Sequence, residues 1–260
     1  MATVIVTGAS MGIGKALALA WAERKDTVVL SARSKDALDE VAREVEAKGG
    51  RAIVVPGDVT NEAHRKELVE RAVAETGAID VLVNNAGRGF LALALKIDVA
   101  QMRDLFELNV VAPLHLAQLA APHLERSRGT IVMMSSIAGV VAAPRYGAYA
   151  ASKFALEALA MSMRSELAAS GIRVVVVRPG PVATPFRVNA TRAEGESYDA
   201  PVDPKAQSPE TIADLTLRAV DRATAIVETS AYVRFASAAS RIAPPAVRVA
   251  LRRMATKAAS

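Results

Sequence analysis

The stretch Thr7-Gly8-Ala9-Ser10-Met11-Gly12-Ile13-Gly14 follows the short apolar run Val4-Ile5-Val6 and leads into a segment whose apolar residues recur at helical spacing. This order predicts a strand, a tight turn and a helix. Gly8 permits the sharp turn, Gly12 leaves room for a pyrophosphate at the backbone, and Gly14 permits close packing of helix on strand. The first N–H groups of such a helix attract phosphate. A glycine-rich turn also occurs in ordinary loops, so its meaning depends on the rest of the chain.

Length and composition favour one large α/β domain. The chain has 260 residues, of which 52% are apolar and 4% aromatic, so a core of Ala, Val, Leu and Ile is expected. It contains no cysteine, which excludes disulfides, thiolate metal sites and a cysteine nucleophile. His64, His115 and His123 stand apart in the sequence, so we expect no metal site.

Apolar runs of strand type recur along the chain, separated by amphipathic segments. They lie at residues 4–6, 28–30, 53–55, 81–83, 131–134, 174–177 and 226–227. Alternation of this kind predicts a single-domain Rossmann fold, an α/β structure with a doubly wound parallel sheet of about seven strands and helices on both faces. We expect residues 1–230 to form the nucleotide-binding catalytic domain and residues 231–260 a basic helical extension. The stretch from Arg187 to Pro209 predicts a loop of the kind that often closes over a site.

The ends of the chain bear on location and partners. No basic leader precedes the first strand, and no run approaches the length of a membrane span, so we expect a cytoplasmic protein. The formal net charge is +5, and residues 231–260 carry six basic residues and no acid, which leaves −1 for the rest. The body of the chain therefore gives no reason to expect nucleic-acid binding.

Several short motifs together resemble those of the short-chain dehydrogenase/reductase family. They occur in the family's order over roughly residues 1 to 190, as Thr7 to Gly14, Asn84-Asn85-Ala86-Gly87, Asn109, Ser136, Tyr149, Lys153, Pro179-Gly180 and Thr184. The resemblance implies hydride exchange between a nicotinamide cofactor and a carbonyl or alcohol. It also implies that the catalytic residues are Asn109, Ser136, Tyr149 and Lys153.

Tyr149 and Lys153 are four residues apart, so on a helix they share one face, separated by a rise of roughly 6 Å. An adjacent ammonium group and an oxidised nicotinamide favour the phenolate, and we expect them to lower the pKa of Tyr149 toward 7, a shift worth about 4 kcal/mol. Tyr149 would then exchange a proton with the substrate oxygen, which Ser136 holds by a hydrogen bond. By resemblance, Lys153 also binds the nicotinamide ribose and Asn109 positions a proton-relaying water. Taken singly, each residue also fits an ordinary structural role.

The end of the second strand predicts which cofactor binds. Dinucleotide folds place an acid there for the 2′-hydroxyl of NAD, or an arginine for the 2′-phosphate of NADP. Here the strand ends in Ala32-Arg33, without a carboxylate. We therefore predict NADP (NADPH) in preference to NAD, with Arg33 on the phosphate and Ser10 and Lys35 as further contacts. The alternative is that Arg33 is a solvated loop residue.

The resemblance implies the other cofactor contacts. Asp58 and Val59 would touch the adenine, residues 85–87 would line the floor of the site, and the segment from Pro179 to Thr184 would hold the nicotinamide carboxamide. The full predicted cofactor-binding set is Gly8, Ser10, Gly12, Ile13, Gly14, Arg33, Asp58, Val59, Asn85, Ala86, Gly87, Tyr149, Lys153, Pro179, Gly180, Val182 and Thr184.

The basic extension contains a second amphipathic pattern. After Pro244-Pro245, the apolar residues form a helical stripe that consists of Val247, Ala250, Leu251, Met254 and Ala258. Such a helix either lies on an anionic membrane surface or packs on this domain or a partner subunit. We favour packing, because the helix lacks Trp and Phe.

The leading interpretation is an NADP-dependent carbonyl reductase or alcohol dehydrogenase with a small, apolar substrate. One alternative is a non-catalytic NADP-sensing regulatory or scaffold protein. Another is an epimerase or dehydratase that uses transient hydride transfer, although little chain is left for the larger substrate domain usual in such enzymes. The resemblance also implies a homodimer or homotetramer in which the helices bearing Asn109 and Tyr149 pair across a two-fold axis.

Overall fold

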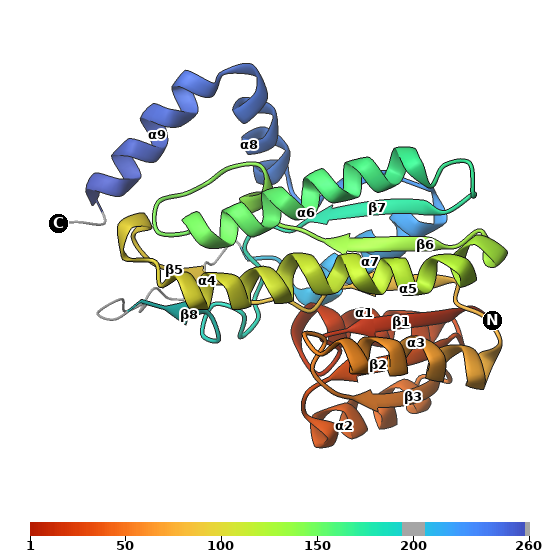
Figure 1. The fold of residues 1–260 in the computed structure, drawn as a ribbon. Helices are drawn as coiled ribbons and strands as arrows, with labels where there is room; N and C mark the ends of the chain where they lie inside the picture. Colours follow the sequence, from red (N-terminus) through yellow and green to blue (C-terminus); the bar gives the residue numbers. More distant parts are fainter. Residues whose placement is uncertain (194–205, 258–260) are drawn as a thin grey trace.

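The computed structural model describes residues 1–193 and 206–257. Its centre is a seven-stranded parallel sheet with the order β3-β2-β1-β4-β6-β7-β9 (Figure 1). The strands are β1 (Thr3–Thr7), β2 (Thr27–Ala32), β3 (Arg51–Pro56), β4 (Val81–Asn84), β6 (Thr130–Met134), β7 (Arg173–Arg178) and β9 (Ile226–Glu228). This confirms the predicted Rossmann fold. The strand order reverses between β1 and β4, and folds of this type bind ligands at the carboxyl edge near that point.

Helices cover both faces of the sheet. The first face carries α1 (Gly12–Glu23), α2 (Lys35–Ala47) and α7 (Pro209–Asp221), and the second carries α3 (Glu62–Thr76), α5 (Ala112–Ser127) and α6 (Gly147–Glu166). Successive strand residues point to opposite faces, so Val4 and Val6 pack in the first core cluster and Ile5 in the second. Because both faces are buried, the strands are nearly continuous apolar runs.

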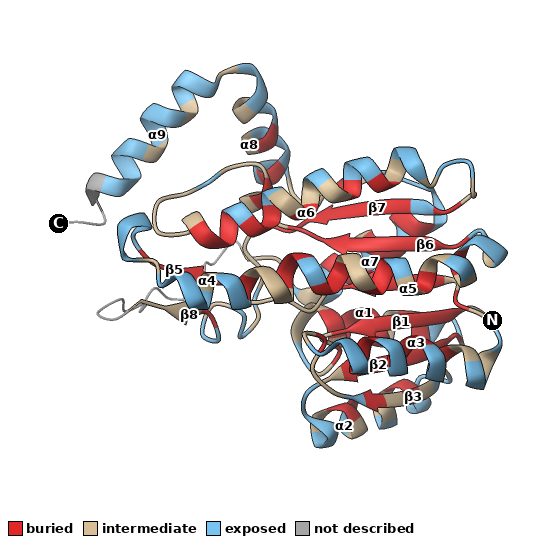
Figure 2. Ribbon diagram, viewed as in Figure 1, coloured by how far each residue is buried: buried red, intermediate tan, exposed pale blue. Residues whose placement is uncertain are grey.

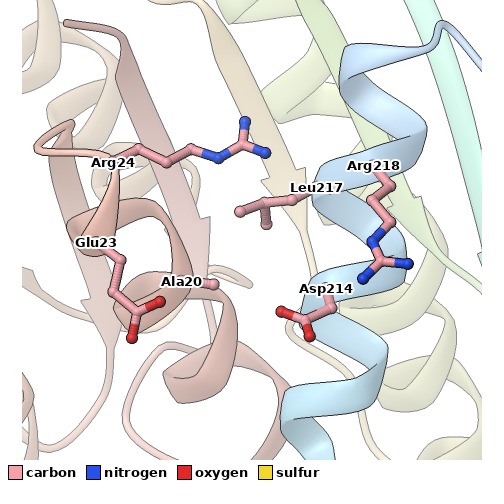
Figure 3. A pocket seen from close by; sticks show the side chains of 6 residues that line it. All are labelled: Ala20, Glu23, Arg24, Asp214, Leu217 and Arg218. Carbon is pink, nitrogen blue, oxygen red and sulfur yellow. The ribbon is translucent and has the colours of Figure 1, made fainter.

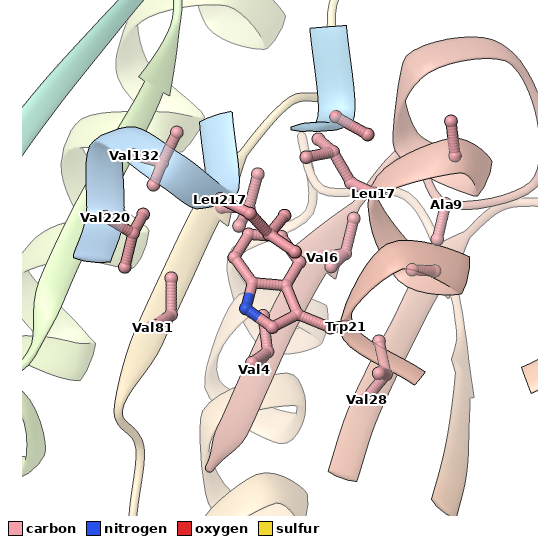
Figure 4. Packing of buried hydrophobic residues seen from close by; sticks show 14 of the residues in the cluster. Val4, Val6, Ala9, Leu17, Trp21, Val28, Val81, Val132, Leu217 and Val220 are labelled. Atoms are coloured by element: carbon pink, nitrogen blue, oxygen red, sulfur yellow. The ribbon is translucent and has the colours of Figure 1, made fainter. Parts of the chain in front are cut away.

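The packing between α1 and α7 centres on Trp21. Its side chain is 2% exposed and belongs to the first core cluster. The indole lies against the sheet near Val4 and Val6, with Leu217 of α7 beside it (Figure 4). This contact fixes α1, and with it the glycine turn that precedes α1.

Two short strands lie outside the main sheet. β5 (Phe90–Leu91) and β8 (Thr191–Arg192) pair in parallel, and the Thr191 N–H donates to the Gly89 carbonyl at 3.0 Å. The sequence predicted a loop throughout residues 187–209, and β8 corrects this because its backbone pairs with a distant segment. The part of the predicted loop at residues 194–205 lies outside the described residues.

The C-terminal region consists of two helices, α8 (Ala231–Ile242) and α9 (Pro244–Lys257). Val233 of α8 is fully buried, so α8 is attached to the domain. α9 stands outside both helix layers, and none of its residues from Pro244 to Ala255 is buried (Figures 1 and 2).

The apolar stripe of α9 therefore packs little on this domain, and its predicted packing on a partner subunit stays a prediction. Val247 and Leu251 are only half-buried, and Met254 is exposed. Among the described residues, no helix has both the length and the apolar character needed to cross a bilayer.

Candidate active site

The glycine turn joins β1 to α1 at the carboxyl edge of the sheet. Gly8 and Gly12 have φ angles of 65° and 55°, in the left-handed region that favours glycine. A Cβ on Gly14 would lie 2.1 Å from the Gly8 carbonyl oxygen and 2.6 Å from Nδ2 of Asn85. A side chain at Gly14 would therefore force the turn and the helix apart.

The N-terminus of α1 is open at this turn. Met11 precedes the helix, offers no capping hydrogen bond and is 49% exposed. Ser10 and Ile13, both predicted to bind the cofactor, are partly exposed beside it. The first N–H groups of a helix have no partner within the helix, so this uncapped end fits a pyrophosphate.

The segment after β7 closes the site from the opposite side. A Cβ on Gly12 would lie 3.1 Å from Cγ2 of Thr184, so Thr184 lies directly across the turn. The Pro179 carbonyl accepts a hydrogen bond from the Ile137 N–H at 2.9 Å, which ties this segment to the loop that contains Ser136. The structure thus brings together predicted site residues that follow β1, β6 and β7.

Gly180 and Val182 continue this segment. A Cβ on Gly180 would lie 3.1 Å from Cγ2 of Val233, so α8 packs directly on the segment. Val182 forms an isolated parallel bridge with Gln207. The C-terminal region is therefore in contact with the predicted nicotinamide end of the site.

Thr7 connects the glycine turn to the end of β4, a role that the sequence analysis did not assign. Its Oγ1 accepts hydrogen bonds from the N–H groups of Asn85 and Ala86, both at 3.0 Å. The Asn85 side chain donates in return to the carbonyls of Thr7 at 2.9 Å and Gly8 at 3.3 Å. Asn85 and Ala86 therefore lie at the glycine turn, with the Asn85 amide group bracing it, and their predicted place on the floor of the cofactor site stays a prediction.

Arg33 and Asp58 lie close together at the ends of β2 and β3. Arg33 is exposed. Burial disfavours the charged form of Asp58, but hydrogen bonds from the Thr60 N–H and hydroxyl, at 2.9 and 2.8 Å, and the charge of Arg33 lower its pKa below the usual value. The side chain of Val59 is 7% exposed and packs in the core, which leaves its backbone for the predicted adenine contact.

Ser136, Tyr149 and Lys153 meet where β6 ends and α6 begins. The Ser136 hydroxyl hydrogen-bonds with the Tyr149 side chain. Nζ of Lys153 lies 5.8 Å from the centre of the Tyr149 ring and donates to the Met134 carbonyl at 2.8 Å. A Cβ on Gly87 would lie 3.6 Å from the same Nζ. The predicted catalytic groups therefore converge beside the predicted floor of the cofactor site.

The protein's own groups raise the pKa of Tyr149, and the predicted lowering beside a bound oxidised nicotinamide stays a prediction. Burial raises the pKa of Tyr149 to about 12, and the hydrogen bond with Ser136 opposes this shift without cancelling it. Burial also lowers the pKa of Lys153 to about 8, against the opposing influence of the Glu157 carboxylate. Both shifts share one cause, because removal from water disfavours the charged form of each group.

Asn109 is fully buried in a π-helical turn, Glu107–Val111, that joins α4 (Val99–Phe106) to α5. Its Nδ2 donates to the Arg88 carbonyl and to Oγ of Ser152, and its Oδ1 accepts from the Arg88 N–H, all at 3.0 Å. Ser152 donates in turn to the Tyr149 carbonyl at 2.7 Å. Asn109 therefore braces the backbone around Tyr149. Its predicted role in holding a water stays a prediction.

Phe186 adds an apolar surface to the site. Its ring centre lies 5.7 Å from that of Tyr149, with the two planes tilted by 56°. Phe186 is 37% exposed, so it offers part of its ring to a ligand. This position agrees with the apolar pocket lining that the sequence suggests for Phe186, and it depends on the path of the chain after β7.

A buried arginine links this site to the C-terminal region. Arg178, at the end of β7, makes two hydrogen bonds to the Glu157 carboxylate, at 2.9 and 2.8 Å. It also donates to Glu228 of β9 at 3.1 Å and lies 3.5 Å from Oγ of Ser237 in α8. Glu157 lies one helical turn beyond Lys153, so Arg178 joins the helix of the catalytic cluster to β9 and α8. No spacing in the sequence indicates this network, because its members lie on strands and helices that are far apart in the chain.

A separate cleft lies between α1 and α7, and it contains no predicted site residue. Its volume is about 230 Å³, and its lining residues are Ala20, Glu23, Arg24, Asp214, Leu217 and Arg218 (Figure 3). Within the part of the chain that the structure describes, no cluster of three or more His, Cys, Asp or Glu residues is placed to hold a metal.

Comparison with known proteins places this geometry in a family. The model of the short chain dehydrogenase family matches residues 2–195, and the chain belongs to this family. The ketoacyl reductase HetN of Nostoc sp. is 34% identical to it over 85% of this chain and 76% of its own.

Two solved structures resemble the fold over most of its length. A short-chain dehydrogenase from Sphingobium yanoikuyae in complex with NADPH has a TM-score of 0.80 and 29% identity, covering 97% of this chain and 96% of its own. A short chain dehydrogenase/reductase from Burkholderia phymatum in complex with NAD has a TM-score of 0.81 and 25% identity, covering 90% and 92%. The chain is thus similar to proteins that bind either nicotinamide cofactor.

Proposed function

We propose that this chain is an NADP-dependent oxidoreductase that interconverts a carbonyl and an alcohol. The observation that carries the proposal is the meeting of Ser136, Tyr149 and Lys153 at the sheet edge where the glycine turn opens. The nicotinamide cofactor, when bound, supplies or accepts the hydride. The residues of the glycine turn would hold its pyrophosphate, and the segment from Pro179 to Thr184 its nicotinamide end.

The protein's part of the reaction is a proton transfer at Tyr149. With its pKa at about 12, the Tyr149 hydroxyl keeps its proton at neutral pH and is ready to give it to a carbonyl oxygen during reduction. Ser136, already bonded to that hydroxyl, would hold the same oxygen. Lys153, largely protonated at pH 7 with a pKa of about 8, would stabilise the phenolate that is left.

The test is replacement of Tyr149 by Phe, which removes the proton donor and keeps the ring. We expect NADPH oxidation with a panel of ketones and aldehydes to fall by at least about a thousandfold. NADPH binding, measured by fluorescence titration, should change little. Tyr232→Phe, on the exposed face of α8, is the matched control and should keep full activity. Near-normal turnover in the Tyr149→Phe protein would contradict the proposal, and NADPH binding without turnover in the wild type would favour a cofactor-sensing role.

The preference for NADP rests on Arg33. Its exposed guanidinium near Asp58 suits a 2′-phosphate at the end of β2. Arg33→Asp should weaken NADPH binding by about a hundredfold or more and NADH binding much less, because the charge-assisted bonds go to the phosphate alone. Arg43→Asp, an exposed arginine on α2, controls for the change in net charge. Equal losses for both cofactors would refute the assignment.

An apolar substrate and a two-fold dimer complete the proposal. Phe186 beside Tyr149 favours a substrate with an apolar group next to its carbonyl. Val111 at the junction with α5, and Phe154 and Met161 on α6, are 43%, 44% and 67% exposed, which suits helix pairing between subunits. Phe154→Glu together with Met161→Glu should lower the mass measured by light scattering, whereas an unchanged mass would exclude pairing through α6.

A further inference from the structure

The outward face of α8 is an apolar stripe that contains aromatic residues. Tyr232, Phe235 and Ile242 are 62%, 75% and 84% exposed. Their spacing places them on one side of the helix, opposite the buried Val233 and Ser237 that attach α8 to the domain. Large apolar side chains exposed together on one helix face mark an interaction surface.

Positive charge borders this stripe. Arg234 and Arg241 are exposed, and their seven-residue spacing places them on one side of α8 next to the stripe. Arg248 is exposed on α9. Residues 231–260 carry six basic residues and no acidic one, so the partner of this surface should be negatively charged.

The partner of this surface of α8 must suit both its arginines and its exposed aromatic and aliphatic side chains. A second copy of the same face would bring Arg234, Arg241 and Arg248 against the same three arginines, and residues 231–260 contain no acid to pair with them. A nucleic acid would satisfy the arginines but leave the apolar stripe in water. An anionic lipid surface satisfies both, because aromatic and aliphatic side chains insert at the headgroup boundary while arginines contact the headgroups.

We propose that α8 and α9 bind the surface of an anionic lipid bilayer, with Phe235 and Ile242 inserted at the headgroup boundary. The lack of Trp and Phe after Pro244 argued against such binding in the sequence, but the structure places the aromatic residues on α8 instead. α8 packs on Gly180 through Val233 on its buried face, so the proposed lipid surface lies on the other side of α8 from the segment that borders the site. The inference goes beyond the proposed oxidoreductase activity and does not depend on it.

The test is flotation of the full chain with lipid vesicles. One set contains phosphatidylcholine alone, and the other contains equal parts of phosphatidylcholine and phosphatidylglycerol. We expect the protein to float with the anionic vesicles only, and less at about 1 M than at about 0.1 M salt, because salt screens the arginine contacts.

Phe235→Ser with Ile242→Ser should lower the partition coefficient by at least about tenfold. Arg234→Glu with Arg241→Glu should lower it by about tenfold or more.

Matched variants separate the surface from a general change in hydrophobicity or charge. Leu95→Ser removes a fully exposed apolar residue elsewhere and should leave flotation unchanged. Arg43→Glu controls for the loss of positive charge on α2. Three results would overturn the proposal: wild-type protein that fails to float with anionic vesicles, flotation that survives both double substitutions, and a drop in oligomeric mass of the Phe235→Ser/Ile242→Ser protein without loss of flotation. The third would assign the surface to contacts between copies.

Discussion

Gly14 is the residue at which the glycine turn and α1 approach most closely. A methyl group there would sit 2.1 Å from the Gly8 carbonyl oxygen and 2.6 Å from Nδ2 of the Asn85 side chain, so the Gly8 backbone itself would have to move. Gly14→Ala should therefore distort the turn, lower the free energy of unfolding by about 3 kcal/mol, and abolish NADPH binding. Urea unfolding followed by circular dichroism and an NADPH titration would measure the two effects.

Gly147, at the start of α6, is the matched control. A Cβ there would meet no atom within 4 Å. Gly147→Ala should be neutral, or stabilising by up to about 1 kcal/mol, because alanine restricts the unfolded chain. If Gly147→Ala lowered the free energy of unfolding and NADPH binding as much as Gly14→Ala does, the close contacts at Gly14 would not be the reason that this position requires glycine.

The lowered pKa of Lys153 makes the free energy of unfolding depend on pH. Burial lowers its pKa from 10.5 to about 8, so between these values the unfolded chain binds more protons than the folded one. Stability contributed by this group therefore rises with pH from about 8 to 10.5, and below pH 8 the folded state bears the cost of a buried charge. Tyr149, raised from 10 to about 12, titrates above this window.

Lys153→Met should consequently stabilise the protein at neutral pH while removing activity. We expect a gain of about 1–2 kcal/mol at pH 7, after the loss of the hydrogen bond to the Met134 carbonyl. The gain should shrink toward zero as the pH rises to 10.5. Urea unfolding of wild type and variant at both ends of the window would measure it, and a difference that stays the same at every pH would contradict the assigned shift.

At the scale of elements, Arg178 holds α6, β7, β9 and α8 in register. Its side chain is 5% exposed, and the carboxylates of Glu157 and Glu228 are 14% and 23% exposed. Arg178→Met would leave both carboxylates poorly solvated and unpaired, so we expect a loss of about 3–5 kcal/mol in urea unfolding. Adding Glu157→Gln should recover part of the loss, because it removes one unpaired charge.

Arg24 provides the comparison for this prediction. It makes the same two-point contact, with Asp221 at 2.8 and 2.6 Å, but both side chains are at least 40% exposed. Water solvates both partners when this pair is broken, so Arg24→Met should cost less than about 1 kcal/mol. If Arg24→Met and Arg178→Met lowered the free energy of unfolding equally, burial would not determine how much each ion pair contributes to stability.

The same scale shows what the sequence could predict. The seven strands were visible because residues such as Val28, Leu30 and Val174 to Val177 are buried on both faces, which removes polar residues from each run. The two-residue strands β5 and β8 left no such pattern, since their pairing depends on segments about a hundred residues apart. Among the predicted site residues, the spacing of Tyr149 and Lys153 specified their shared helix face, whereas the bracing roles of Asn85 and Asn109 depend on backbone groups that no spacing reveals.

At the scale of the whole molecule, the two C-terminal helices differ in how deeply their residues are buried against the domain. Val233 of α8 is fully buried, whereas no residue of α9 from Pro244 to Ala255 is. A chain that ends at residue 243 should therefore unfold within about 2 °C of the full chain. A chain that ends at residue 230 loses Val233 and the partner of Arg178 on α8, and should unfold at least about 5 °C lower. Calorimetry would measure both melting temperatures. If both truncations lowered the melting temperature equally, α9 would belong to the folded unit as much as α8 does.

Trp21 is the only tryptophan of the chain, and its indole is enclosed between α1, α7 and the sheet. Its fluorescence therefore reports on a single, known place in the molecule. Emission should be blue-shifted in the native state and move to longer wavelength only when α1 separates from α7. Because the C-terminal helices carry no indole, changes at the proposed lipid surface can be followed with an added dye while Trp21 reports independently on the integrity of the domain.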